Sequence, residues 1–287
     1  YHKTMECYAH AKAQLFALLS EAGCKTGKTA VINADDAAGE IMRANSRCPV
    51  LSYGVDAPAE LTAQDIHLAQ DRMRLSLVQR HFGARTLTIG LTGLFNVYNV
   101  LAAVGAALAE HVSIEDSLTA LEGFSGVPGR FEFVRAGQDF SVIVDYAHTP
   151  DALINVLETI HEIKAEGAKV LCVVGCGGDR DRGKRPIMAH EAALRCDRLL
   201  LTSDNPRSER PETIIEEMKA GLSPEELSRT LTITDRAEAI RTATMLAGQE
   251  DIILIAGKGH ETYQEIDGVR HHFDDREIVL EQISHEA

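Results

Sequence analysis

The 287-residue chain lacks long apolar runs and has few basic residues for its length. No apolar run approaches the roughly 20 residues that a membrane-spanning helix needs, so we expect no contact with a membrane. Against 43 acidic side chains there are only 29 lysines and arginines, which gives a formal net charge of -14. This balance argues against sequence-independent nucleic-acid binding, which needs a basic surface. It still allows an anionic ligand in a local basic pocket.

The cysteines lack the spacings that would define a disulfide framework or a metal site. They form no C-x-x-C pair and stand at Cys7, Cys24, Cys48, Cys172, Cys176 and Cys196. This pattern favours reduced thiols in a cytosolic protein. The first residue is Tyr1 and not methionine, and we expect further sequence upstream of it.

An apolar fraction of 45% is ample for packed cores, and the length predicts about two domains at roughly 150 residues each. In the first half we expect a helix over residues 5–21, with Tyr8, Ala11, Leu15, Leu18 and Leu19 near one face. Strands are expected over residues 30–33, 50–53, 66–69, 75–79 and 85–90. A helix follows to residue 110, and Ser113 should cap another, with Asp116 as the acid of a capping box.

Residues 23–29, Gly-Cys-Lys-Thr-Gly-Lys-Thr, look like a phosphate-binding loop but do not fit its pattern. That motif needs four residues between its glycines and lies between a strand and a helix. Here three residues separate the glycines, and the stretch lies between a helix and a strand. We therefore do not interpret it as a phosphate loop.

The pattern changes after residues 126–130, Gly-Val-Pro-Gly-Arg, which read as a domain linker. Strands are expected over residues 131–134, 141–145, 170–175, 198–202, 231–233 and 252–256, alternating with helices. Several of these strands are continuous apolar runs, which predicts a mostly parallel sheet buried on both faces in an α/β fold.

Four polar loops follow strands of this predicted sheet, where an open α/β sheet binds its ligand. They cover residues 145–151, 175–185, 202–207 and 257–261. The third loop, Thr-Ser-Asp-Asn-Pro-Arg, suits a small zwitterion, because Arg207 can grip a carboxylate and Asp204 can accept from an ammonium. Ordinary turn chemistry is the alternative explanation for this loop.

The second loop invites a dinucleotide-binding interpretation, but the third glycine of G-x-G-x-x-G would fall on Arg180. Arg180 and Arg207 together suit a ligand with two carboxylates, or with a carboxylate and a phosphate. A solvated charge run explains Asp181, Arg182 and Lys184 better than it explains Arg180.

The four loops, together with Gly-Leu-Phe-Asn at 93–96 and Gly-Arg-Phe-Glu at 129–132, resemble the Mur ligases of peptidoglycan synthesis. The Asp-Asn-Pro-Arg loop resembles the members that add meso-diaminopimelate. The resemblance implies that residues 1–127 are the later part of a central P-loop-type ATPase domain. It also implies that residues 128–287 are a Rossmann-like, amino-acid-binding C-terminal domain. The phosphate loop and a uridine-nucleotide domain would lie upstream.

The implied reaction is amide formation driven by ATP. ATP phosphorylates the D-glutamate side chain of UDP-MurNAc-L-Ala-D-Glu, and an amine of meso-diaminopimelate attacks the acyl phosphate. The resemblance also implies Mg²⁺ and a bacterial cytoplasmic location, and we expect a monomer.

The resemblance assigns roles residue by residue. It implies that Lys12 is carbamylated and binds magnesium, and that His148 lies near the phosphates. Adenine and ribose would be bound by Asn96, Asn99, Arg130 and Asp145. The diaminopimelate site would consist of Arg180, Asp204, Asn205, Pro206, Arg207, Gly257 and Glu261.

Two alternatives remain. The protein could be a related ligase that adds lysine or glutamate, although Arg207 favours diaminopimelate. The 287 residues could also form a binding module without catalysis, since they lack the phosphate loop, and we expect them alone to be inactive or nearly so.

Overall fold

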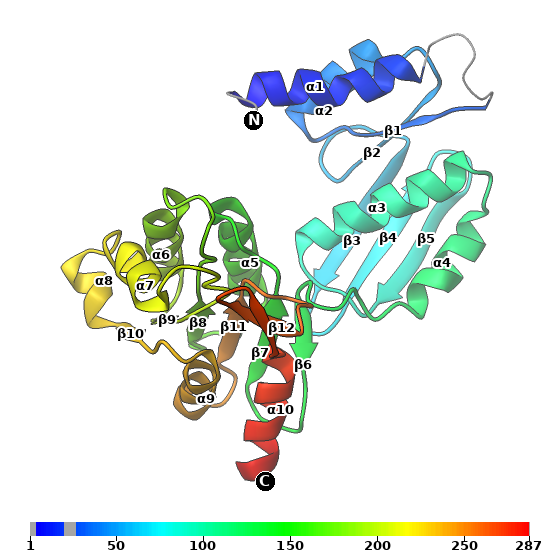
Figure 1. The fold of residues 1–287 in the computed structure, drawn as a ribbon. Helices are drawn as coiled ribbons and strands as arrows, with labels where there is room; N and C mark the ends of the chain where they lie inside the picture. The colour runs from blue at the N-terminus through cyan, green and yellow to red at the C-terminus, as the bar shows by residue number, and fades with distance from the viewer. Residues whose placement is uncertain (1–3, 20–26, 287) are drawn as a thin grey trace. The chain divides into compact units, whose positions relative to one another are not determined.

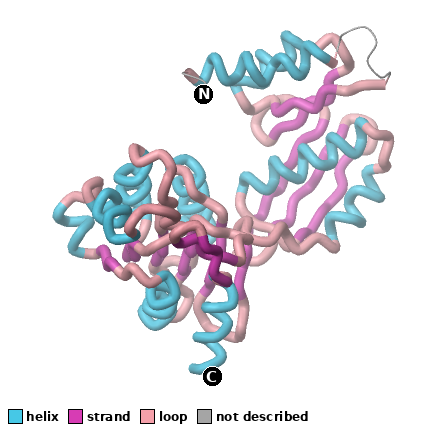
Figure 2. The backbone as a smooth tube through the Cα atoms, in the orientation of Figure 1, coloured by secondary structure: helices cyan, strands magenta, loops and turns pink. Residues whose placement is uncertain are grey.

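The computed structural model describes residues 4–19 and 27–286. The chain divides into two compact units, Tyr1–Ser125 and Gly126–Ala287 (Figure 1). Each unit combines helices with a sheet, as the tube drawing shows by colour (Figure 2). The predicted α/β class is therefore confirmed. Among the described residues, no helix has both the length and the apolar character that crossing a membrane requires.

The first unit contains four helices and five strands among its described residues. They are α1 (Met5–Leu18), β1 (Ala30–Asn33), α2 (Ala37–Asn45), β2 (Val50–Gly54), β3 (Leu61–Leu68), β4 (Met73–Gln79), β5 (Gly83–Ile89), α3 (Leu94–Ala109) and α4 (Ile114–Glu122). The sheet runs β1-β2-β3-β4-β5, parallel as far as β3 and antiparallel beyond it. Helix α3 packs on β1 to β3, and α4 packs on β5.

The sequence predicts most of these elements but misses some details. Strand β3 begins at Leu61, five residues before the predicted start, and α2 was not predicted. The apolar face expected on the first helix is not buried, since Leu15 and Leu18 are exposed and Ala13 is its only buried residue. Ser113 does cap α4, but its hydroxyl donates to Asp116, and this is not the reciprocal backbone bond of a capping box. Residues 23–26 of the loop that looks like a phosphate loop lie outside the described residues.

The second unit contains a longer alternation of strands and helices. Its elements are β6 (Glu132–Val134), β7 (Ser141–Asp145), α5 (Pro150–Ile163), β8 (Val170–Val174), α6 (Lys184–Arg195), β9 (Arg198–Leu201), α7 (Pro211–Lys219), α8 (Pro224–Ser228), β10 (Thr230–Thr232), α9 (Arg236–Leu246), β11 (Ile252–Ala256), β12 (Tyr263–Ile266), β13 (Val269–His272) and α10 (Asp275–Glu286).

Six of these strands form one sheet in the order β10-β9-β8-β11-β7-β6. All neighbours are parallel except β6, which pairs antiparallel with β7. Strands β8 and β11 are buried at every residue, as their continuous apolar sequences predict. Helices α9 and α10 supply core residues on one face, while α5 and α6 contact the sheet as well. The mostly parallel, Rossmann-like sheet is confirmed.

A buried ion pair joins α9 to α10 behind the end of β11. The Arg236 and Asp275 side chains are both 0% exposed, and they make two hydrogen bonds, of 2.7 and 2.8 Å. Arg236 Nη2 also donates to the Ala256 carbonyl at 3.1 Å, at the last residue of β11. This pair therefore fixes the strand end from which the fourth polar loop leaves.

Replacing Asp275 by alanine should lower the free energy of unfolding of the second unit by ~3–5 kcal/mol, because Arg236 would remain buried without an anion. Urea denaturation of the chain measures this change. The matched control is Glu238→Ala, which breaks an exposed pair with Arg241 on α9 and should cost at most about 1 kcal/mol. Equal losses in the two variants would contradict this role of the buried pair.

Candidate functional site

The four polar loops line one cavity in the second unit, with a volume of about 420 Å³. They follow β7, β8, β9 and β11, whose carboxyl ends lie at one edge of the sheet. The lining residues are Tyr146, His148, Thr149, Gly175, Cys176, Gly177, Arg180, Asp181, Lys184, Asp204, Asn205, Arg207, Gly257 and Glu261. The polar loops expected at the ends of these strands thus meet in one pocket.

Most of the residues predicted to bind the amino acid line this cavity. They are Arg180, Asp204, Asn205, Arg207, Gly257 and Glu261, and His148 joins them. Pro206 does not line it, and its carbonyl oxygen lies close to Gly178. Arg180 has no ion pair with any residue in the described part of the chain, so its guanidinium is available to a ligand.

Arg207 adopts a left-handed backbone conformation, with φ of 52°, which is uncommon for a residue other than glycine. Backbone hydrogen bonds hold it there: its N–H donates to the Glu265 carbonyl at 3.0 Å, and its carbonyl accepts from the Asp267 N–H at 2.7 Å. The hairpin of β12 and β13 thereby sets the direction of the Arg207 side chain. The guanidinium Nη1 donates to the Gly178 carbonyl at 2.8 Å.

The glycines after β8 allow the neighbouring loop to approach closely. A Cβ on Gly178 would lie 1.9 Å from the Pro206 carbonyl oxygen, and one on Gly177 would lie 2.9 Å from Arg207 Nη1. Distances this short exclude a side chain at Gly178. The glycine pattern that suggested a dinucleotide loop therefore serves the contact between the second and third polar loops.

Asn205 and Glu261, which line the cavity, form a polar cluster with Lys258, which does not. Asn205 Nδ2 donates to Glu261 Oε2 at 2.8 Å, and Lys258 Nζ lies 3.1 Å from Asn205 Oδ1 and 3.3 Å from Glu261 Oε2. Beside it, a Cβ on Gly257 would lie 2.6 Å from the Asp204 carboxylate. The loop after β11 thus contacts two acids of the site, Glu261 through Lys258 and Asp204 through Gly257.

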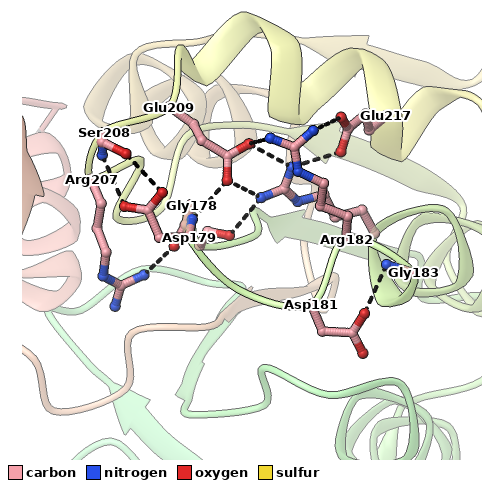
Figure 3. Close-up of polar contacts among 11 residues, drawn as sticks. Gly178, Asp179, Asp181, Arg182, Gly183, Arg207, Ser208, Glu209 and Glu217 are labelled. Atoms are coloured by element: carbon pink, nitrogen blue, oxygen red, sulfur yellow. Dashed lines mark hydrogen bonds and ion pairs between the residues drawn. The ribbon is translucent and has the colours of Figure 1, made fainter.

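Behind the cavity, a network of charged side chains ties the second loop to the third (Figure 3). The buried Arg185 makes two-pronged contacts with Glu209, at 2.8 and 3.0 Å, and also reaches Glu217 and the Gly177 carbonyl. Asp179 accepts from the Ser208 hydroxyl at 2.7 Å, next to Arg207. The Arg185 guanidinium holds the pKa of Glu209 down to about 2.

A solvated charge run describes Asp181 and Arg182 in part, since both are exposed, whereas Lys184 is half-buried. Asp181 and Lys184 line the cavity, and Arg182 pairs with Glu209 at 2.8 Å. Lys184 begins α6 and donates to the His148 carbonyl at 2.7 Å. These residues look like ordinary surface residues in the sequence because Glu209 and the His148 carbonyl, which pair with Arg182 and Lys184, belong to segments distant in sequence.

His148 is an exposed residue of the first polar loop, residues 145–151, and lines the cavity. Its Nδ1 lies 2.9 Å from the Tyr146 carbonyl, which can only accept, so Nδ1 carries a proton. Nε2 is then free to face a ligand. Tyr146 packs against this imidazole, with ring centroids 4.6 Å apart, and the Arg130 guanidinium lies 4.7 Å from the Tyr146 ring centroid.

Asp145, at the end of β7, is buried and does not line the cavity. Its carboxylate accepts from the Phe131 N–H at 2.7 Å and the Ala147 N–H at 2.8 Å. Burial raises the pKa of Asp145, while these two donors act in the opposite direction. In this structure Asp145 shapes the loop, and its role in binding a nucleotide stays a prediction.

The remaining predicted residues lie in the first unit. Asn96 is buried on α3 and donates to the Thr92 carbonyl at 2.8 Å, while Asn99 donates to Asn96 Oδ1 at 3.0 Å. Lys12 is an exposed residue of α1 whose ammonium lies 5.3 Å from the Tyr8 ring centroid. Within residues 4–19 and 27–286, no cluster of histidine, cysteine and acidic side chains could hold a metal ion.

Sequence reasoning missed two lysines of the site. Lys258 stands within the fourth polar loop, but nothing in the sequence shows that its side chain is fully buried. Lys184 was assigned to solvent, although a basic residue at the start of α6 beside a glycine-rich loop is a usable signal. Cys176 also lines the cavity, where burial raises the pKa of its thiol to about 12 and leaves it protonated.

The geometry suits one kind of ligand. Two guanidinium groups, the Lys184 ammonium and three carboxylates, those of Asp181, Asp204 and Glu261, line a cavity of a few hundred Å³, the usual size of a small-molecule site. A zwitterion with carboxylate and ammonium groups matches both charges, whereas a purely apolar ligand would leave them unpaired.

Two protein-family models match the chain. The Mur ligase middle domain matches residues 1–107, and the Mur ligase glutamate ligase domain matches residues 129–259. Among curated proteins, a UDP-N-acetylmuramoyl-L-alanyl-D-glutamate–2,6-diaminopimelate ligase of Bacteroides thetaiotaomicron is 46% identical over 98% of this chain and 56% of its own length. The ligase of the same name from Bacillus cereus is 47% identical, over 99% of this chain and 57% of its own length.

Solved structures agree with these matches. A structure of a UDP-N-acetylmuramoyl-L-alanyl-D-glutamate–2,6-diaminopimelate ligase has a TM-score of 0.66 and 40% identity, over 100% of this chain and 58% of its own. The MurF ligase of Thermotoga maritima in complex with ADP has a TM-score of 0.68 at 16% identity, with the same two coverages, and shows the fold alone. The chain spans a little over half the length of the curated relatives it matches.

The fold and cavity define an α/β protein with a parallel-sheet domain suited to a small zwitterionic ligand. The chain belongs to the Mur ligase family, of which it carries the middle and C-terminal domains.

The contact between Arg185 and Glu209 predicts how the free energy of unfolding changes at acid pH. Because the native pKa of Glu209 lies near 2, below its ordinary 4.5, this carboxylate stabilises the fold above about pH 4.5. That contribution is lost as the pH falls toward 2. The free energy of unfolding should therefore differ most between wild type and Glu209→Gln near neutral pH, and the difference should narrow below pH 4.5.

Urea denaturation at several pH values between 7 and 3 measures this difference. Glu216→Gln is the matched control, because Glu216 pairs with Lys219 on the surface of α7 and with no other cation among the described residues. Its difference from wild type should stay small at every pH. A Glu209→Gln difference that does not change with pH would show that the Arg185 contact is not responsible.

Proposed function

We propose that the whole protein is an ATP-dependent ligase that adds meso-diaminopimelate to UDP-MurNAc-L-Ala-D-Glu in the bacterial cytoplasm. The names of the relatives, at 46–47% identity across nearly the whole chain, support this proposal. The observation that carries it is the position of Arg207, whose guanidinium lies in one cavity with the acids Asp204 and Glu261.

Diaminopimelate has an amino-acid centre at each end, so its far end carries both a carboxylate and an ammonium. We assign the far carboxylate to Arg207 and Arg180, and the far ammonium to Asp204 or Glu261. Lysine has no far carboxylate and would leave Arg207 without its anion. A site built around a polar group can reject an analogue that lacks the group by ~10⁴.

The reaction forms an amide in two steps. A phosphoryl group passes from ATP to the D-glutamate side-chain carboxylate, which gives an acyl phosphate and ADP. An amine of diaminopimelate then attacks the acyl carbon, the C–N bond forms, the C–O bond to phosphate breaks and the nitrogen loses a proton. Cations stabilise the charge that develops on the phosphoryl oxygens.

Within this chain, the cavity residues bind and orient the incoming amino acid. His148 and Lys184 lie at the same cavity and are the groups available to phosphoryl oxygens. The His148 Nδ1 proton is held by the Tyr146 carbonyl, so Nε2 would donate to phosphoryl oxygens only when the imidazole carries a second proton there.

The other assignments belong to the same proposal. Residues 1–127 would be the later part of the ATPase domain, and residues 128–287 the amino-acid-binding domain. Asn96, Asn99, Arg130 and Asp145 would bind the nucleotide. A carbamate on Lys12 would supply oxygen ligands that hard Mg²⁺ accepts.

Arg207→Ala should lower kcat/KM for diaminopimelate by an amount equivalent to ~2–5 kcal/mol, the usual cost of breaking a buried charge pair. The measurement is steady-state kinetics of the full-length ligase with saturating ATP and nucleotide substrate. The rate with lysine, which has no carboxylate for Arg207, should change far less.

The matched control is Arg210→Ala, three residues along the same segment, where the side chain is 84% exposed and does not line the cavity. Its kcat/KM should stay within about twofold of wild type, as for most surface substitutions. Unchanged use of diaminopimelate by Arg207→Ala would refute the assignment.

A further inference from the structure

Lys258 has an unusual environment for a lysine. Its side chain is 0% exposed, and it does not line the cavity although the neighbouring Gly257 and Glu261 do. A buried ammonium is costly unless it is paired and hydrogen-bonded. Its position therefore needs an explanation in terms of the groups that it contacts.

The partners of Lys258 are two of the residues assigned to the substrate. Its Nζ lies 3.1 Å from Asn205 Oδ1 and 3.3 Å from Glu261 Oε2. The ring of Tyr263 lies 5.5 Å away and adds a favourable contact for the charge. Lys258 thus joins the third polar loop to the fourth.

These contacts determine how the Asn205 carboxamide is oriented. Two donors converge on one end of the group, the Lys258 ammonium and the Glu265 N–H at 3.0 Å. Only the carbonyl oxygen can accept from both, so the Nδ2 end must face Glu261, where it donates at 2.8 Å. Without Lys258 the carboxamide would lose its charged donor.

The same contacts leave one oxygen of Glu261 for a ligand. Oε2 accepts from both Asn205 and Lys258. Oε1 accepts no hydrogen bond from the part of the chain that the structure describes, and Glu261 lines the cavity. An ammonium group in the cavity can therefore pair with Oε1 without displacing an internal partner.

We propose that Lys258 is a positioning residue that holds Asn205 and Glu261 in the arrangement that receives the far ammonium group of the amino-acid substrate. This inference rests on the proposed function and adds to it the side chain that sets its selectivity. Lys258 itself does not touch the substrate.

The test compares two substrates in the full-length ligase. One is meso-diaminopimelate, and the other is 2-aminopimelate, which keeps both carboxylates but has a single amino group. In Lys258→Met the KM for meso-diaminopimelate should rise about 10- to 100-fold, the range for leaving a buried charged partner unsatisfied. The KM for 2-aminopimelate and the kcat values for both substrates should change less than about threefold, since none of these three constants depends on binding of the far ammonium.

Lys219→Met is the matched control. Lys219 also pairs with a glutamate three residues away, Glu216, but on the surface of α7. Its kinetic constants should equal those of wild type. If wild type does not use meso-diaminopimelate, the proposed function fails. If wild type uses it and Lys258→Met changes both substrates equally, Lys258 has only a structural role and the inference fails.

Chemical rescue covers the case in which Lys258→Met does not fold. Lys258→Ala leaves room for a small amine, so added methylammonium should restore the KM for meso-diaminopimelate at least partly, whereas tetramethylammonium should not. Absence of rescue together with an unfolded Lys258→Met protein would overturn the proposal, because the lysine would then serve only the fold.

Discussion

The close approach of two loops over Gly178 is the constraint on which the site depends. The Pro206 carbonyl lies where any side chain at Gly178 would have to be, so the loop after β9 can settle against the loop after β8. That contact brings Arg207 Nη1 to the Gly178 carbonyl. The hairpin then fixes the Arg207 backbone from the other side, in a left-handed conformation that the loop alone would not favour. A carboxylate ligand in this cavity would therefore meet a guanidinium whose direction is already set.

Charge in this unit is divided between residues that serve the fold and residues left for a ligand. Three cations are fully buried and donate hydrogen bonds to acids and carbonyl groups within the protein. They are Arg185, Arg236 and Lys258. Arg180 and Arg207 line the cavity, and neither makes a close ion pair with a carboxylate in the described residues, the nearest being Glu265 at 3.9 Å from Arg207. This division leaves two guanidinium groups for an anionic ligand in a chain with a net charge of -14.

Much of this arrangement follows from the sequence, because the ends of the buried strands can be recognised where apolar runs give way to polar loops. The apolar runs of β8 and β11 predict buried parallel strands, and the carboxyl ends of such strands meet at one edge, so the polar loops had to converge. The Asp-Asn-Pro-Arg stretch predicts its own chemistry, since a guanidinium beside a carboxylate suits a zwitterion. The sequence does not say which members of a loop face the ligand. Pro206 and Asp145 do not line the cavity; the Pro206 carbonyl lies against Gly178, and the Asp145 carboxylate accepts from two backbone N–H groups.

The buried cations that the sequence did not predict share one physical cause, which is that the burial of a charged side chain depends on partners distant along the chain. Lys258 and Asn205 are 53 residues apart, and Arg185 and Glu209 are 24 apart. Within its own segment each cation resembles an ordinary solvated residue. Glu209 reaches Arg185 from another loop, and Lys258, whose counter-charge Glu261 is only three residues away, takes its second partner, the Asn205 carboxamide, from the loop after β9. The converse holds for the first helix, where a local apolar stripe predicts burial that this part of the chain does not supply. Local patterns therefore predict elements well, whereas the assignment of cations to fold or ligand requires the tertiary contacts between loops.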